Sequence, residues 1–152
     1  MVSENMDVSF QEKSAAISLV AVLAVYGYYF YFVFLGAGPA SPEEMLFWMV
    51  GLVVVLVIVQ VAFHIVVAVL NPREANAAED ERERLIALKA YRVSYLLMSA
   101  GALVVLGRIL FGSVVEPEQV TLLGIANLLL FALVLAEVGH YAAAIYHFRR
   151  GV

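Results

Sequence analysis

Three ionisable residues stand close together near the end of a largely apolar sequence. In the stretch AEVGHYAAAIYHFRR, Glu137 precedes His140 by three residues, and His147 follows two helical turns later. Residues three or four apart are neighbours on a helix, so His140 is a candidate partner for Glu137, and Arg92 is another. Carboxylate and imidazole groups bind metals, hold haem iron and exchange protons. Because a charged side chain inside a bilayer costs roughly 2.5–3.5 kcal/mol, we expect these residues to face the protein interior.

A second polar pair occupies an earlier apolar stretch, QVAFHIVVAVL, in which Gln60 lies one turn before His64. If both stretches form membrane helices that run in the same direction, His64 and His140 each lie on the order of 10–12 Å from the inner helix ends. The sequence therefore predicts a shared polar layer. Its expected members are Gln60, His64, Glu137 and His140, with Arg92 and His147 as further members of the network.

Two structural interpretations fit this layer. In the first, the polar side chains form a hydrogen-bonded cluster that holds the helices in register, since membrane helices lack a hydrophobic drive to associate. In the second, a single zinc or iron ion is bound by His64, Glu137 and His140, with Glu81 or Glu83 completing the ligand set. The spacing Glu-x-x-His is that of dimetal bundles, but those bundles need two such pairs and further glutamates.

Two further interpretations involve electron or proton chemistry. His64 and His140 at equal depth can hold a b-type haem between their helices. Alternatively, Glu137, His140 and His147 form part of a proton or ion path along one helix face. No nucleophile–base–orienter set, glycine-rich phosphate loop or H-E-x-x-H motif occurs in the sequence, so nothing in it points to an enzyme.

The composition identifies an integral membrane protein. Of 152 residues, 64% are hydrophobic and 14% are charged, whereas soluble domains are roughly 45–50% apolar. The absence of cysteine excludes disulfides, thiolate metal sites and cysteine nucleophiles. A net charge of −4 argues against nucleic-acid binding, which needs a basic surface.

Four apolar segments are long enough to span a hydrocarbon core, which takes about 20 helical residues. They cover about 14–36, 44–70, 86–112 and 119–147. Ser41 and Glu44 have the spacing of a capping box at the second span. Short connections between spans favour antiparallel neighbours. We expect one all-α transmembrane domain over 1–152, folded as a four-helix, up-down antiparallel bundle.

Basic residues lie almost entirely on one side of this topology, which predicts cytoplasmic termini and a cytoplasmic middle loop, in a bacterial inner membrane. Arg108 is the exception, and its long side chain can reach toward the outer interface. The basic residues on the inner side are Lys13, Arg73, Arg82, Arg84, Lys89, Arg92, Arg149 and Arg150.

The charged segment 73–92, which we call the cytoplasmic collar, has two interpretations. It is either a solvated, ion-paired extension of the third helix or a docking surface for a soluble partner. Asp80 and Arg84 have the i,i+4 spacing of a helical ion pair. The residues expected to dock a partner are Asp80, Glu81, Arg82, Glu83 and Arg84.

The segment EDERERLIALKAYRVSYLLMSAG, with the QVAFHIVVAVL helix and the AEVGHYAAAIYHFRRG tail, resembles a family of uncharacterised small four-span bacterial membrane proteins. The likeness covers about 44–151. It implies a bacterial inner-membrane location and a four-helix fold, and it supplies no activity or site residues.

From these patterns we expect a small structural or regulatory membrane protein that contacts the lipid bilayer and either copies of itself or a cytoplasmic protein. The alternatives are a metal- or haem-binding protein and a proton-responsive or ion-conducting element.

Overall fold

The computed structural model describes residues 10–70, 80–115 and 120–150, and these residues form four α-helices. Each helix is long and apolar enough to cross a membrane, so the prediction of an all-α chain with four helices of membrane-spanning length is confirmed. The helices are α1 (Phe10–Phe34), α2 (Pro42–Leu70), α4 (Glu81–Val115) and α5 (Leu122–Arg150).

The observed helices extend beyond the expected spans at their polar ends. Helix α4 begins at Glu81 and α5 continues to Arg150, because charged residues outside the hydrocarbon can still be helical. The start of α5 lies later than expected. There, the Thr121 Oγ1 atom accepts a hydrogen bond from the Gly124 N–H at 3.0 Å, which caps the first turn.

The connection between α1 and α2 is defined by its capping residues. Gly36 has a φ of 71°, and the Ala37 N–H donates to the carbonyl of Phe32 at 2.9 Å, as in a Schellman motif. Ser41 Oγ accepts from the Glu44 N–H at 3.2 Å, as predicted. The Glu44 carboxylate reaches the N–H of Ala40 at 2.8 Å rather than that of Ser41, so the box is displaced by one residue.

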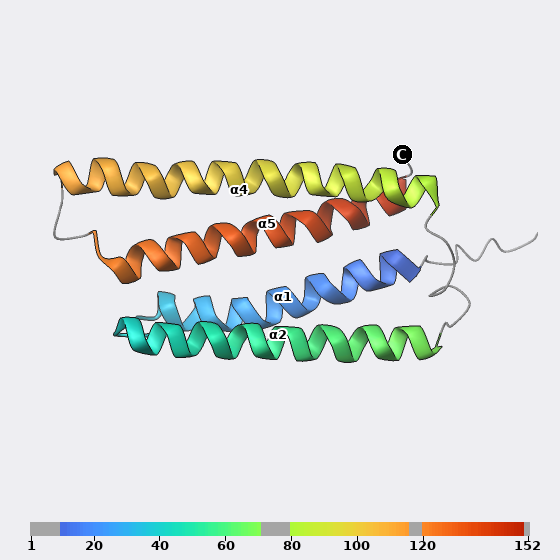
Figure 1. Cartoon of the computed structure of the whole chain (residues 1–152), viewed down its shortest axis with the longest axis horizontal. Coiled ribbons are helices and arrows are strands. Elements are labelled where there is room, and N and C mark those ends of the chain that lie inside the picture. Colours follow the sequence, from blue (N-terminus) through green and yellow to red (C-terminus); the bar gives the residue numbers. More distant parts are fainter. Residues whose placement is uncertain (1–9, 71–79, 116–119, 151–152) are drawn as a thin grey trace, which may run out of the picture.

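The helices lie side by side in the order α4, α5, α1, α2 (Figure 1). Extensive contacts join α4 to α5, α5 to α1, and α1 to α2, whereas α2 touches α5 only slightly. Helices α2 and α4 are not packed against each other. One side of the assembly is therefore open between these two outer helices.

Small residues bring α4 and α5 very close together. A Cβ atom at Gly101 would collide with the Cβ of Ala132, and one at Gly139 would collide with the side chain of Leu97. Without a hydrophobic drive between helices in lipid, such close approach supplies the packing contacts that hold them. This pair is the most extensive helix contact in the protein.

Aromatic and amide side chains join α1 to its neighbours. Tyr29 is completely buried, and its hydroxyl donates to the Oδ1 atom of Asn127 in α5 at 2.6 Å. The Nδ2 of Asn127 donates in turn to the Leu123 carbonyl at 3.0 Å, which fixes the amide. Tyr29 also lies 5.9 Å from the ring of Trp48 in α2. One buried side chain thus links three helices.

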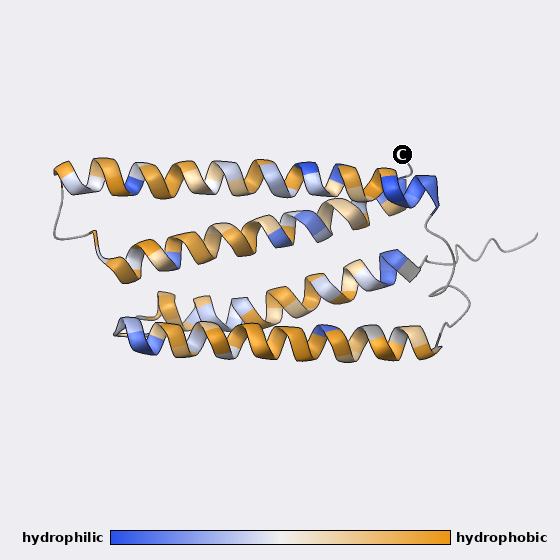
Figure 2. Cartoon of the chain, in the orientation of Figure 1, coloured by the Kyte–Doolittle hydropathy of each residue, from blue (hydrophilic) through white to orange (hydrophobic). Residues whose placement is uncertain are grey.

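Hydrophilic residues gather where α2 begins and, at the opposite end of the helices, where α1 and α4 begin (Figure 2). At this end Arg82 Nη2 donates to the Phe148 carbonyl at 3.1 Å, and Arg149 forms an ion pair with Glu12 at 3.1 Å. Arg82 therefore satisfies a carbonyl in the last turn of α5, where a cation is favoured. Part of the charged collar is engaged within the protein itself.

The close contact of α4 with α5 predicts a difference between two glycines of the same helix. Gly101→Ala places a methyl group against Ala132 and should lower the free energy of unfolding by about 1–3 kcal/mol. Gly107→Ala meets nothing within 4 Å and should leave stability unchanged or slightly higher. Thermal unfolding in detergent, followed by circular dichroism, measures both. Equal effects would show that α4 and α5 do not approach at Gly101.

Candidate functional site

A groove of about 620 Å³ lies between α2 and α4, with α1 and α5 forming its base. Its walls are mainly apolar and include Met49 and Leu56 of α2 and Met98 of α4. Polar side chains from all four helices also line it. These are Tyr26, Gln60, Tyr91, Ser94, Tyr95, Glu137 and Tyr141.

Glu137 is the acidic member of this set and lies near the middle of α5 (Leu122–Arg150). Its side chain is exposed and opens into the groove. None of the described residues that line the groove is basic. A carboxylate at this depth is costly unless a proton or a cation neutralises it. The groove thus holds a carboxyl group for which its described lining offers no basic partner.

Tyr141 connects this carboxylate to the other helices. Its hydroxyl lies within hydrogen-bonding reach of Glu137, of Gln60 in α2 and of Ser18 in α1. Tyr26 of α1 is also close enough to Glu137 to interact with its charge. Gln60 and Glu137, which were expected to share one polar layer, therefore meet through Tyr141.

His140 faces a different neighbour from Glu137. Its ring lies 4.7 Å from that of Tyr91 in α4 and 5.2 Å from that of Tyr141. Ala136 and Ala144, four residues before and after it, are buried in the packed face of α5. The candidate pairing of Glu137 with His140 does not form, because this face turns His140 toward α4. The His140 Nδ1 atom is buried and has no hydrogen-bond partner among the described residues.

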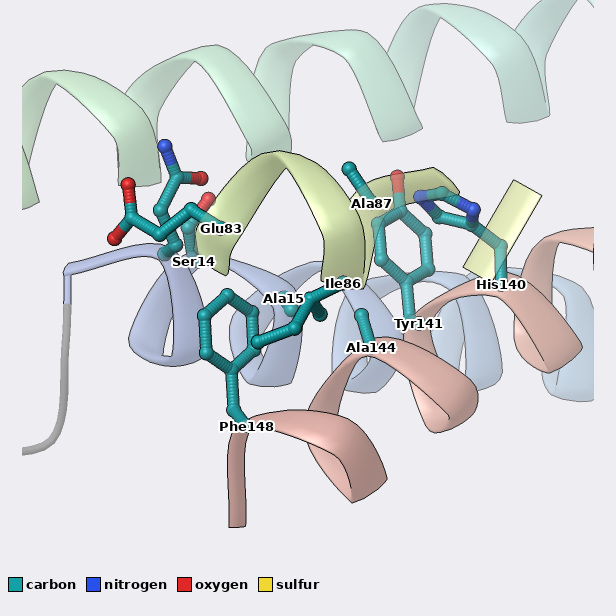
Figure 3. A pocket seen from close by; sticks show the side chains of 10 residues that line it. Ser14, Ala15, Glu83, Ile86, Ala87, His140, Tyr141, Ala144 and Phe148 are labelled. Carbon is teal, nitrogen blue, oxygen red and sulfur yellow. The ribbon is translucent and has the colours of Figure 1, made fainter. Parts of the chain in front are cut away.

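A second, smaller cavity of about 130 Å³ lies between the start of α1, the start of α4 and the end of α5. Glu83 and Ser14 lie at one end of it, and His140 and Tyr141 lie at the other (Figure 3). Tyr141 lines both this cavity and the groove. Its ring is therefore a common wall between the polar end of the helices and the membrane-level groove.

The remaining predicted network residues lie apart from the groove. Arg92 is exposed on α4 and does not line it. His147 is half-buried and stacks on Tyr146, with ring centres 5.3 Å apart. His64 lies within α2, but its side chain is outside the described part of the structure.

No group of three or more His, Asp or Glu side chains that could hold a metal ion occurs among the described residues. His140 packs against α4 rather than toward α2. The assignments of zinc, iron or haem to His64, Glu137 and His140 gain no support from these contacts. They stay predictions, because they include the side chain of His64.

Within the collar, the described residues have different surroundings. Asp80 precedes α4, and its N–H donates to the Glu83 carboxylate at 3.4 Å. Arg82 is bound to α5, whereas Glu81 and Arg84 are exposed. Residues 73–79 of the collar lie outside the described residues. Docking of a partner on this segment stays a prediction.

Sequence reasoning missed the tyrosines of the groove. Tyr91 and Tyr95 are four residues apart in α4, and so are Glu137 and Tyr141 in α5. This spacing places each pair on one helix face, which was the available signal.

No family model matches this chain, and no curated protein or solved structure matches it either. The resemblance to small four-span bacterial membrane proteins therefore stays an expectation.

The unpaired nitrogen of His140 predicts that two substitutions act in opposite directions. His140→Phe keeps a ring between Tyr91 and Tyr141 and removes a buried polar atom without a partner, so stability should be equal or higher. His140→Ala leaves a cavity and should cost about 2–4 kcal/mol. Thermal unfolding in detergent compares them. A large loss in His140→Phe would mean that Nδ1 has a partner in the membrane.

Proposed function

We propose that this chain is a multi-pass membrane protein that binds a cationic ligand within the membrane, at the carboxylate of Glu137. In this proposal the groove between α2 and α4 is the binding site, and its open side admits the ligand from the lipid. The protein belongs to the proton- or ion-responsive class of the expected alternatives, with Glu137 as its ionisable centre.

One observation carries this proposal: a mid-helix carboxylate is exposed in a groove rather than sealed in the core. A glutamate that served packing alone would be buried with a basic partner or turned toward water. Glu137 has neither arrangement among the described residues, since the group within its hydrogen-bonding reach is the phenol of Tyr141. Its charge is then available to a ligand or to a proton.

A structural role is the second candidate, and the contacts of Tyr141 favour it. Its hydroxyl is within reach of Ser18, Gln60 and Glu137, so one side chain links α5 to α1 and α2. Hydrogen bonds between membrane helices contribute about 0.6 kcal/mol each on average. Such a role explains the position of Tyr141 and Gln60. It leaves the exposure of Glu137 unexplained.

For the topology, we propose an up-down antiparallel bundle in the bacterial inner membrane with both termini cytoplasmic. The basic residues Arg82, Arg149 and Arg150 at one end of the helices support this orientation. The opposite end carries Glu43 and Glu44 in the first turn of α2.

The absence of cysteine makes this topology directly measurable. Ala40→Cys, in the connection between α1 and α2, should react with a membrane-impermeant maleimide added to intact spheroplasts. Arg84→Cys, in the collar, should react only in inverted vesicles or after the membrane is permeabilised. The converse pattern would reverse the orientation. Labelling of both from one side would contradict the single span, α2, that this topology places between them.

The groove predicts that a hydrophobic carbodiimide modifies Glu137. Such reagents dissolve in lipid and react with carboxyl groups that they reach there, and Glu137 opens toward the lipid side of the groove. Mass spectrometry of the purified protein should find one adduct, located in the peptide that contains Glu137. A charged, water-soluble carbodiimide should instead modify Glu43 and Glu44, which are exposed at a helix end.

The matched control is Glu137→Gln, which keeps the shape of the side chain and removes the reactive acid. The adduct should disappear in this variant, and labelling of Glu44 should not change. If Glu137 stays unmodified in folded protein but reacts after unfolding, the carboxylate is sealed in the core, and the structural role holds instead.

A further inference from the structure

We propose that the ligand of the groove is an amphiphilic organic cation, with a delocalised positive charge on a bulky apolar body. This inference rests on the proposed function, since it uses the same carboxylate. It adds the class of ligand and the residues that select it. Three observations support it. Tyrosine rings line the groove together with Glu137, few of the lining side chains are of the kinds that bind metal ions, and the remaining walls of the open groove are apolar.

Aromatic rings from three helices line the same groove as the carboxylate. Tyr91 and Tyr95 line the groove from α4, Tyr26 lines it from α1 and Tyr141 from α5. A ring face attracts a cation, and the attraction grows where water is excluded. A carboxylate combined with several tyrosines is therefore a set of groups that recognises a weakly hydrated cation.

Inorganic cations fit this site poorly. Calcium takes six to eight oxygen ligands, and magnesium demands an octahedron of close oxygens. The polar oxygens near Glu137 come from one amide and from neutral hydroxyls such as that of Tyr141. No group of three His, Asp or Glu side chains that could hold a metal forms in the described part of the chain. An organic cation does not need such a shell, because its charge is spread and its hydration is weak.

The remaining walls suit an apolar body. Met49 of α2, Met98 of α4 and Leu133 of α5 line the groove, and methionine adapts its shape to different ligands. The volume of about 620 Å³ lies within the usual range of roughly 300–1,000 Å³ for small-molecule sites. Because α2 and α4 are not packed together, a ligand dissolved in the lipid can enter between them.

Tyr95 is the ring best placed to select the ligand. Its side chain is 71% exposed and lines the groove. Tyr91 packs against the ring of His140, and Tyr141 lies within hydrogen-bonding reach of several side chains, so both have structural roles. Tyr95 has no such hydrogen bond or ring contact with the other described residues. Its substitution therefore tests ligand recognition with little effect on folding.

The test measures binding of tetraphenylphosphonium to the full chain in lipid nanodiscs by equilibrium dialysis. Tetraphenylborate, which has nearly the same shape and the opposite charge, is the matched control ligand. We expect saturable binding of the cation and none of the anion. Glu137→Gln should weaken binding at least about tenfold, which corresponds to the loss of one charge contact. Glu137→Asp should retain part of the affinity.

The selective role of the ring is tested at the same time. Tyr95→Leu should weaken binding about 3-fold to 30-fold, because it removes a ring face from the cation. Tyr95→Phe should bind like the unmodified protein. Tyr31→Leu, which changes an exposed tyrosine of α1 that does not line the groove, should have no effect.

The outcomes separate this inference from the proposed function. If carbodiimide modifies Glu137 but tetraphenylphosphonium does not bind, the ligand class is wrong and the cation or proton site stands. If neither occurs, both proposals fail. Equal uptake of tetraphenylphosphonium and tetraphenylborate, or binding unchanged in Glu137→Gln, would mean partition into lipid and would overturn the inference. If Tyr95→Leu and Tyr95→Phe bind tetraphenylphosphonium with equal affinity, the ring of Tyr95 does not contribute to binding of the cation.

Discussion

The close approach of α4 and α5 determines the rest of the arrangement. Gly101 and Gly139 allow the two backbones to meet at distances that no larger residue permits. In lipid this packing is a main source of helix association, so it fixes the rotation of α5 about its axis. His140 turns toward α4 as a result, and Glu137 turns toward the groove. The exposure of the carboxylate therefore follows from packing on the neighbouring side of the helix.

The four helices were predictable from the sequence because each is an apolar segment longer than the membrane requires. The cap at Ser41 was predictable for a similar reason, since it depends on local spacing alone. The residue at which α5 starts was harder to predict. Its cap is Thr121, and hydropathy does not distinguish a capping threonine from one inside the helix.

The site was predictable only in part, because helix rotation and helix order are tertiary properties. Three residues turn a helix by about 300°, so Glu137 and His140 lie about 60° apart and can face different neighbours. Spacing indicated that they were adjacent, and only the packed alanines around His140 show which way each one points. Likewise, nothing in the sequence of α4 indicated that Tyr91 and Tyr95 would lie across a groove from Gln60.

Helix α2 is attached to the protein along one side, through α1. The tight α4–α5 pair and the buried contact of Tyr29 with Asn127 hold the other three helices together without it. The wall of the groove that α2 forms therefore has far fewer contacts with the other helices than the wall formed by the α4–α5 pair. For the proposed ligand, such a wall would accept molecules of different widths, and charge and ring contacts rather than a fixed outline would then select among them.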